Sequence, residues 1–314
     1  MKPLRIFTWH VHGNYLYYLT HSSPHEFYLP VGRETGGYAG AAPGFPWPSR
    51  VKNLPVDLIP STEFDLVLYQ SQAHYLKDRQ EILSKEQQQL PAIFLEHDPP
   101  QGHPTDTRHV VDDPAMTLVH VTSFNRLMWD SGRTPTAVIE HGVVVPDDLT
   151  YTGELQKGLV VVNGLHHRGR RLGADIFESV RRRVPLDLVG MESEVMGGLG
   201  EISHEELPRL MCRYRFLFNP IRYTSLGLSV CEAMTLGLPI VGLATTEMVT
   251  AVENGYSGYL ETDVERLIPH MDHLLSSHAD AQRLSRGAKL SARRFAIRRF
   301  ANDWDQLFRR VAAH

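Results

Sequence analysis

Residues 223–260 of this chain read YTSLGLSVCEAMTLGLPIVGLATTEMVTAVENGYSGYL, and this stretch decides the fold. Gly227 precedes a segment that we predict to be a short helix, Glu232 lies inside that helix, and Gly237 ends it. The apolar residues 238–241 then predict a buried strand. A glycine turn, a helix and a buried strand in this order are typical of a parallel α/β sheet.

The predicted helix after Gly227 has the features of an anion-binding site. A helix entered through a glycine turn presents unpaired backbone N–H groups and the positive end of its dipole, and both favour an anion. We therefore expect the N–H groups of Gly227 and Leu228 to contact phosphate or sugar. Glu232, further along the helix, is placed to accept hydrogen bonds from sugar hydroxyls. Phosphate and ribose recognised side by side indicate a nucleotide.

The same stretch resembles the donor-binding core of retaining, family-4-type glycosyltransferases of the GT-B fold, the glycosyl transferases group 1. The residues that match are Gly227, Glu232-Ala233-Met234, Gly237-Leu238-Pro239 and Ile240-Val241. The resemblance implies an α/β fold of two doubly wound Rossmann-like domains that face each other across a cleft. It also implies that Glu232 binds the ribose of a UDP- or GDP-sugar, whose hexose is transferred without a metal ion or further cofactor.

One position departs from the family pattern. The family carries a first glutamate, which handles hydroxyls of the donor hexose, where this chain has Thr224, followed by Ser225. We expect Thr224 and Ser225 to lie in the donor site. The departure leaves two alternatives open, a non-catalytic nucleotide-sugar-binding protein and a sugar-nucleotide epimerase.

The size and composition of the chain are those of a globular protein with two domains. A chain of 314 residues is long enough for two domains of ordinary size. Residues 1–147 hold 11 Lys/Arg against 16 Asp/Glu, and the remainder holds 21 against 20, so a nucleic-acid partner is disfavoured. No apolar run is long enough to cross a membrane, and residues 1–13 lack a signal-peptide profile. We predict a cytoplasmic protein in which Cys212 and Cys231 are reduced core thiols.

Short apolar runs alternate with helical stretches along the whole chain. We predict residues 1–147 to be an acceptor-side domain and 148–300 a nucleotide-sugar-binding domain, with a helix at 301–314 that packs back on the first. Strands are predicted at 4–11, 26–31, 65–70, 92–96, 118–122, 137–140, 159–163, 186–189 and 216–219. Helices are predicted at 72–90, 171–183, 204–214 and 245–253.

Residues 32–60 are rich in glycine, proline and aromatic residues, so they cannot be regular structure along their whole length. Loops of that length are disordered or line a site. Tyr38, Phe45 and Trp47 are compatible with the second reading.

Basic residues follow the predicted strand 159–163. Arginines at such a strand–helix junction can clamp a diphosphate while the leaving group gains charge. The resemblance places an arginine and a lysine in this loop, and we assign the catalytic diphosphate contact to Arg168 and Arg171, with Arg170 as a third candidate. Surface arginines at a helix start are the alternative reading.

His97 ends the predicted strand 92–96, and it resembles the family's histidine that faces the donor sugar. We expect a catalytic role in which His97 binds a donor hydroxyl or assists the leaving diphosphate. Gly13 and Asn14, in the first strand–helix turn, match the place where the family brings a loop near the diphosphate and the acceptor. We expect the acceptor to be a glycan, a lipid-linked molecule or a small molecule.

No metal site is expected. The chain has 17 histidines but no His-Glu-x-x-His motif and no cysteine–histidine set. Asp303-Trp304-Asp305 spells a metal-binding pattern of another glycosyltransferase fold. Residues two apart on a helix do not share a face, so we dismiss it.

Overall fold

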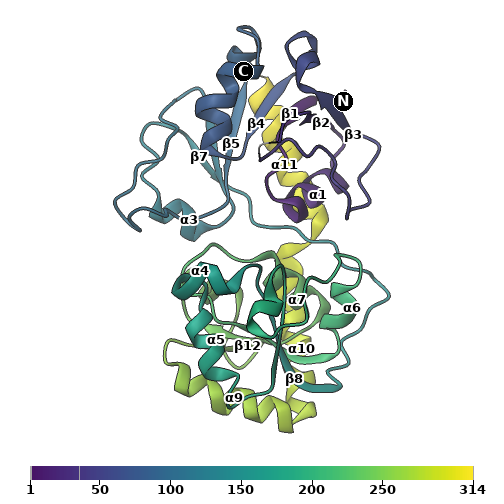
Figure 1. Ribbon diagram of the computed structural model, residues 1–314, viewed down its shortest axis with the longest axis vertical. Coiled ribbons are helices and arrows are strands. Elements are labelled where there is room, and N and C mark those ends of the chain that lie inside the picture. Colours follow the sequence, from purple (N-terminus) through teal and green to yellow (C-terminus); the bar gives the residue numbers. More distant parts are fainter. Residues whose placement is uncertain (1, 35, 314) are drawn as a thin grey trace. The chain divides into compact units, whose positions relative to one another are not determined.

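The computed structural model describes residues 2–34 and 36–313. These residues form two compact units, each with its own sheet (Figure 1). Unit 1 comprises the chain up to Gly142 and again from Ile297, and unit 2 comprises Val143–Ala296.

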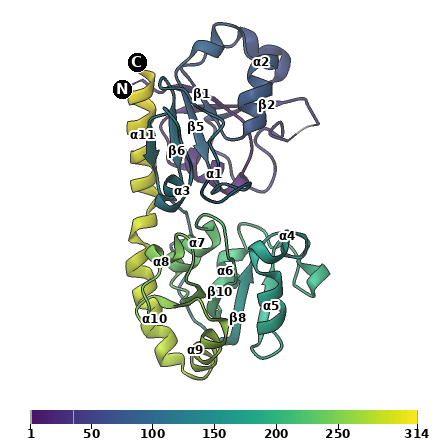
Figure 2. The ribbon, with the colours of Figure 1, turned by 90° about the vertical axis from the view of Figure 1, so that its left-hand side faces the viewer.

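The described residues of unit 1 form a seven-stranded sheet in the order β3-β2-β1-β4-β5-β6-β7, with every neighbouring pair parallel. Its strands are β1 Arg5–Thr8, β2 Glu26–Val31, β3 Val51–Pro55, β4 Leu66–Tyr69, β5 Ala92–Glu96, β6 Thr117–His120 and β7 Thr136–Val138. Its helices are α1 Gly13–His21, α2 Arg79–Ile82, α3 Ser123–Met128 and α11 Ile297–Ala312. Figure 2 shows α11 along one face of this sheet and α2 on the other.

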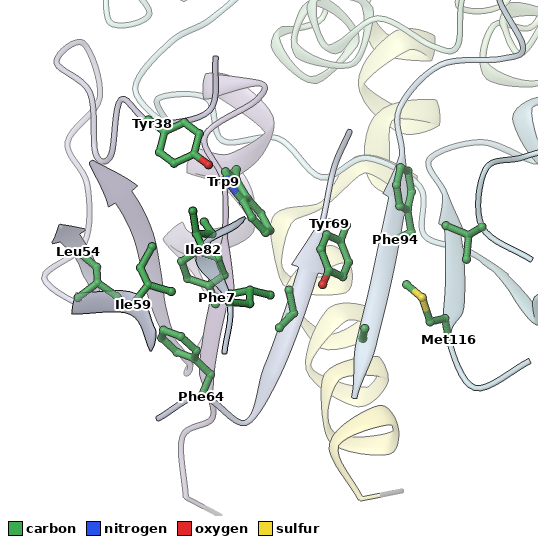
Figure 3. Packing of buried hydrophobic residues seen from close by; sticks show 14 of the residues in the cluster. Phe7, Trp9, Tyr38, Leu54, Ile59, Phe64, Tyr69, Ile82, Phe94 and Met116 are labelled. Carbon is green, nitrogen blue, oxygen red and sulfur yellow. The ribbon is translucent and has the colours of Figure 1, made fainter. Parts of the chain in front are cut away.

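One hydrophobic cluster of unit 1 lies on the face of the sheet opposite α11. Figure 3 shows Phe7, Tyr69 and Phe94, from the adjacent strands β1, β4 and β5, packed in one layer. Trp9 stacks on Tyr69 with a ring-centroid distance of 5.5 Å. Replacing a buried aromatic residue of this kind by alanine lowers the free energy of unfolding by about 3–5 kcal/mol. These rings therefore hold the strands β1, β4 and β5 in place.

The other face of the unit 1 sheet is covered by α11. The indole N–H of Trp304 donates to the Tyr15 hydroxyl at 3.2 Å, and the Phe308 ring lies 5.6 Å from that of His25. Phe300 and Trp304 are both almost fully buried. The last helix of the chain is therefore part of the first unit.

The described residues of unit 2 form a five-stranded parallel sheet in the order β12-β11-β10-β8-β9. Its strands are β8 Leu155–Val161, β9 Leu186–Val189, β10 Tyr214–Asn219, β11 Ile240–Leu243 and β12 Gly258–Glu261. Its helices are α4 Leu165–Leu172, α5 Ala174–Val180, α6 Leu207–Met211, α7 Leu228–Leu236, α8 Met248–Ala251, α9 Val264–Ser276 and α10 His278–Ser291. The predicted α/β fold with two parallel sheets is confirmed.

The strand order reverses once in each sheet. In unit 1 the reversal lies between β1 and β4, and in unit 2 it lies between β8 and β10. Ligands of open α/β sheets bind outside the carboxyl ends of the strands at such a reversal. The loops after these four strands are therefore where a site is expected in each unit.

Some predicted elements differ from the observed ones. The predicted helix 72–90 is a π-helical turn His74–Asp78 followed by α2 and a 3₁₀ turn Gln87–Gln89. The helix stops after Ile82 because the buried Gln87 amide accepts from the Ser84 N–H at 2.9 Å and donates to the Ile59 carbonyl at 2.7 Å. These side-chain bonds compete with continued helix.

The segment 32–60 is less irregular than its composition suggests. It contains β3 and the start of a 3₁₀ helix, Val56–Ser61. Tyr38 belongs to the core, because it is buried and its hydroxyl donates to Asp78 at 2.7 Å. The Tyr38 ring is therefore part of the core packing of unit 1.

Among the described residues, no helix combines the length and the apolar character that a membrane span requires.

Candidate functional site

The loop from β10 to α7 forms the first part of the site in unit 2. Gly227 has extended dihedral angles (φ −68°, ψ 139°), and no side chain caps the helix that starts at Leu228. The N–H groups of the first turn therefore point out of the helix without a side-chain cap. Glu232 lies one turn further along α7 and is 4% exposed. Thr224 is half-buried and Ser225 is buried in the same loop.

The arginine loop after β8 lies against the loop that precedes α7. The Arg171 carbonyl accepts hydrogen bonds from the N–H groups of Arg222 at 3.0 Å and Tyr223 at 3.3 Å. Gly173 has a φ of 85°, and a Cβ at this position would lie 2.1 Å from the Pro220 carbonyl oxygen. Only glycine fits this close approach. The structure therefore brings Arg168–Arg171 and Thr224–Leu228 to the carboxyl ends of β8 and β10.

The arginines occupy a different position from the one predicted. The predicted helix 171–183 is two helices, and Arg168, Arg170 and Arg171 all lie inside the first of them, α4. The left-handed Gly173 separates α4 from α5, and the non-helical Gly169 (φ 57°, ψ −142°) kinks α4 itself. Arg168 and Arg170 therefore do not precede the helix as predicted, and Arg171, predicted to start it, lies near the end of α4.

A cluster of ion pairs around Asp175 includes Arg170 and Arg222. Arg222 makes two bonds to the Asp175 carboxylate, at 2.6 and 2.8 Å, and Arg170 makes a third at 2.6 Å. The hydrogen bonds from Arg222 hold the pKa of Asp175 below its usual value. Arg170 thus pairs with protein, whereas the half-buried Arg171 side chain makes no hydrogen bond or ion pair with residues 2–34 and 36–313. Arg168 is exposed.

Arg222 is a site residue that the sequence reasoning missed. Besides the pair with Asp175, its guanidinium donates to the Arg170 carbonyl at 2.6 Å. It therefore joins the two loops of the site. The available signal was a cation three residues after the buried strand that ends at Asn219, at the carboxyl edge of the sheet.

One group in the described part of the chain has metal-ligand chemistry. The ligand atoms of His166, His167 and Glu192 all lie within 4.8 Å of one another, and all three residues are exposed. Exposed groups of this kind are common in proteins that bind no metal, so we assign this one no role.

In unit 1 the centre of the candidate site is His97, directly after β5. Gln70 donates from its amide nitrogen to the Trp9 carbonyl and the Thr8 hydroxyl, both at 2.9 Å, which fixes the orientation of the amide. Its oxygen therefore accepts from Nε2 of His97 at 3.1 Å. Nδ1 of the neutral ring is left as the acceptor.

The surroundings of His97 keep its ring neutral. Burial, together with the neighbouring rings of His12 and His141, lowers the pKa of His97 well below its usual value. The rings of His12 and His97 lie 4.3 Å apart, and that of Tyr15 lies 4.8 Å from His97. A neutral imidazole can accept a hydrogen bond from a hydroxyl at Nδ1 but brings no positive charge to a phosphate. Gln70, a second residue that the sequence reasoning missed, is a buried polar residue at the end of β4.

Gly13 and Asn14 begin α1, next to the end of β1. A Cβ on Gly13 would lie 2.9 Å from the Phe45 ring, so the glycine lets residues near 45 pack against the helix start. Phe45 in turn stacks on Tyr17 at 5.4 Å. The structure thus places Gly13, Asn14 and His97 at one edge of the unit 1 sheet.

Known proteins resemble this chain in both sequence and structure. Residues 160–277 match the family model of the glycosyl transferases group 1. A D-inositol 3-phosphate glycosyltransferase from Nocardioides sp. (strain ATCC BAA-499 / JS614) is 28% identical over 178 residues, which are 54% of this chain and 38% of that protein. The chain therefore matches well under half the length of this curated relative.

Two solved structures share the fold over nearly the whole chain. The sucrose-phosphate synthase (tll1590) from Thermosynechococcus elongatus has a TM-score of 0.71 and 15% identity, and each chain is covered completely. Alr3699/HepE from Anabaena, in complex with UDP and glucose, has a TM-score of 0.70 and 14% identity, with 97% of this chain and 99% of that chain covered. At such identities the likeness shows the fold alone. Residues 160–277 thus match the family model of the glycosyl transferases group 1, and the chain as a whole has the GT-B fold.

Proposed function

We propose that this chain is a retaining glycosyltransferase that moves a hexose from a nucleotide-diphosphate sugar to an acceptor hydroxyl, without a metal ion. The observation that supports this most strongly is the set of groups at the strand-order reversal of unit 2. There, the uncapped start of α7, the buried Glu232 and the arginines of α4 follow the two strands β8 and β10.

Each of these groups matches one part of the donor. Backbone N–H groups of Gly227 and Leu228 contact phosphate or hexose, and Glu232 accepts from the ribose hydroxyls. Arg168 and Arg171 stabilise the negative charge that develops on the departing diphosphate. The arginines supply the positive charge that a metal ion supplies in other transferases, which is the physical reason to expect no metal requirement.

His97 of unit 1 serves the reaction as a neutral hydrogen-bond acceptor. Its Nδ1 accepts from a substrate hydroxyl, because Nε2 already donates to Gln70. Its lowered pKa argues against the other role considered for it, assistance to the leaving diphosphate. Gly13 and Asn14 lie on the acceptor side of this reaction.

The donor assignment is tested by calorimetric titration of the full chain with UDP, GDP and ADP, and with the matching nucleosides, all in EDTA. One nucleoside diphosphate is expected to bind. Glu232→Gln should lower the affinities for the nucleoside and for the nucleoside diphosphate alike, by at least tenfold, because both carry ribose. Arg168→Ala and Arg171→Ala should weaken only the diphosphate. Arg209→Ala, at an exposed arginine of unit 2 paired with Asp148, is the control.

Transfer is tested with the sugar conjugate of the base identified by calorimetry, in EDTA, with the anomer of the product read by NMR. An axial-to-axial or equatorial-to-equatorial outcome supports retention, and inversion contradicts it. No binding of any nucleoside diphosphate would contradict the donor assignment itself.

A second candidate function, nucleotide-sugar binding without turnover, rests on Thr224. A half-buried threonine stands where the resemblance implies a glutamate for the hexose hydroxyls. Binding with neither transfer nor donor hydrolysis would favour this candidate. Turnover gained or redirected in Thr224→Glu would favour a transferase whose donor choice Thr224 sets.

A further inference from the structure

Unit 1 holds a pocket of about 250 Å³ at the carboxyl ends of β4 and β5. The residues of its lining that matter here are Gln70, Gln72, Glu96, Asp98 and Trp129. Gln70 is also the partner of His97, at 3.1 Å. The pocket therefore shares a wall residue with the histidine that we place in the reaction.

The Glu96 carboxylate in this pocket is held in one orientation. Its Oε1 accepts from the Asp98 N–H at 3.0 Å, and its Oε2 lies 3.2 Å from Nε2 of His109. Nδ1 of His109 accepts from the Val111 N–H at 3.1 Å, so Nε2 carries the proton and donates. The His109 side chain is fully buried, so it holds the Glu96 carboxylate from the interior of unit 1 and leaves the pocket side open. Each of its oxygens keeps a lone pair for a ligand hydroxyl.

Trp129 forms a rigid apolar wall. Its indole N–H donates to the Asp98 carbonyl at 2.9 Å, and its ring meets His109 edge-on at 5.0 Å. An apolar wall beside fixed hydrogen-bond acceptors is a usual composition for a small-molecule pocket. It suits a sugar ring, which presents C–H groups to one side and hydroxyls around its rim.

The charge of the lining selects against anions. Glu96 and Asp98 bring carboxylates, and no lysine or arginine is among the lining residues in the described chain. A phosphate group in this pocket would meet like charge without a cation to compensate it. The volume, below the roughly 300–1,000 Å³ of drug-sized pockets, fits one six-membered ring rather than a chain of several.

We propose that this pocket binds the acceptor, and that the acceptor is a single uncharged polyhydroxylated ring rather than a phosphorylated one. This inference rests on the proposed transferase function and adds the substrate class. It sets the chain apart from its curated relative, whose printed name gives a phosphorylated inositol.

The test compares matched ligands that differ by one phosphate. Myo-inositol with inositol 3-phosphate, and glucose with glucose 6-phosphate, are titrated into the full chain that has been saturated with its nucleoside diphosphate. Binding is followed by saturation-transfer NMR. The uncharged member of at least one pair should bind at least tenfold more tightly than the phosphorylated one.

Two variants locate the binding in this pocket. Glu96→Gln should weaken the uncharged ligand about tenfold. Gln72→Arg adds a cation at an exposed lining position and should increase the affinity for the phosphorylated ligand at least tenfold. The preference for the uncharged ligand over the phosphorylated one should therefore become smaller. Gln89→Arg makes the same charge change at an exposed position outside the lining and should leave the preference unaltered.

Three results would overturn the proposal. They are tighter binding of the phosphorylated members by the unaltered chain, binding that neither Glu96→Gln nor Gln72→Arg changes, and no binding of any uncharged ring. In each case the nucleoside diphosphate titration reports separately on the proposed function. Nucleotide binding without ring binding rejects this inference alone, and the absence of both rejects the transferase as well.

Discussion

His120 is a fully buried histidine at the end of β6. Neither ring nitrogen has a hydrogen-bond partner among the described residues. Burial, with smaller contributions from His109 and Arg126, lowers its pKa to about 3. A buried polar ring without a protein partner costs stability, and the cost grows at a pH where the unfolded chain takes up a proton that the folded chain does not.

The first prediction concerns the acid stability of unit 1. The pKa of His120 is lower in the folded chain than in the unfolded one, so between pH 6.5 and 3 the unfolded chain binds more protons. The free energy of unfolding therefore falls as pH falls through this window, by about 2 kcal/mol at pH 5 for this residue. His120→Leu should remove that loss and narrow the difference in unfolding midpoint between pH 8 and pH 5.

Urea titrations of the full chain at both pH values, with a probe in unit 1, measure this effect. His103→Leu, at an exposed histidine of the same unit, is the control and should leave the pH dependence as it is. An unchanged pH dependence in His120→Leu would contradict the prediction.

The second prediction concerns Arg222, which positions the arginine loop rather than binding substrate. Arg222→Ala should weaken nucleoside diphosphate binding about tenfold, because the loop loses its two bonds to Asp175 and its bond to the Arg170 carbonyl. Arg222→Lys should recover only part of the affinity, since an ammonium cannot make the bidentate pair. Nucleoside affinity should hardly change.

The readout is the same calorimetric titration, with Arg213→Ala as the control, at an arginine paired with Glu154 at 2.6 Å. Full recovery by Arg222→Lys would mean that only the charge of Arg222 matters, and that the loop is positioned by something else.

At the scale of elements, the sequence predicted what depends on hydrophobic patterning and missed what depends on single side chains. The strands β2, β5 and β9 begin and end at the predicted residues, because buried parallel strands are mostly apolar segments that stand out from the polar loops around them. The helix predicted at 72–90 failed because a buried Gln87 ties down backbone groups, a long-range effect that periodicity does not encode.

The candidate site was predictable to a similar degree. The glycine before α7 and Glu232 inside it follow from the local motif. Arg222 and Gln70 were missed because their importance comes from partners 47 and 27 residues away in sequence, Asp175 and His97. Such pairings exist only once the strands are ordered in the sheet.

The third prediction concerns the junction between α4 and α5. Gly173→Ala should destabilise unit 2 and weaken nucleotide binding, because the new Cβ would meet the Pro220 carbonyl in addition to the unfavourable φ of 85°. The expected loss of stability is about 3 kcal/mol.

Gly255→Ala is the matched control. It also has a positive φ, of 74°, but nothing lies within 4 Å of the added Cβ. Thermal unfolding and UDP or GDP titration of both variants separate backbone strain from the clash. Equal losses in the two variants would contradict the role of the close approach.

At the scale of the whole molecule, unit 1 is discontinuous in sequence. Residues up to Gly142 need α11 to cover Tyr15, His25 and Phe27, although Val143–Ala296 lies between them in sequence. Unit 2 is continuous and contains its complete sheet.

The fourth prediction follows from this arrangement. A chain that ends after residue 296 should lose the cooperative unfolding transition of unit 1 and keep that of unit 2, because it lacks the buried Phe300, Trp304 and Phe308. Limited proteolysis should then degrade residues 1–142 first. A chain that ends after residue 312 keeps α11 and is the control. A truncated chain with both transitions intact would contradict the prediction.

The position of α11 at the end of the chain also determines the order in which the two units can fold during translation. At about 5–20 residues per second, roughly 150 residues of unit 2 take on the order of 10–30 s to synthesise after the N-terminal segment of unit 1 has been made. Throughout that interval the surface that α11 will cover, which includes Tyr15 and Phe27, is exposed to solvent or to a chaperone. Unit 2 starts to be translated after unit 1, but its last residue is made before α11, so its chain is complete first. Codon usage within the gene segment for unit 2 should therefore govern the yield of correctly folded unit 1, although it changes no amino acid in either.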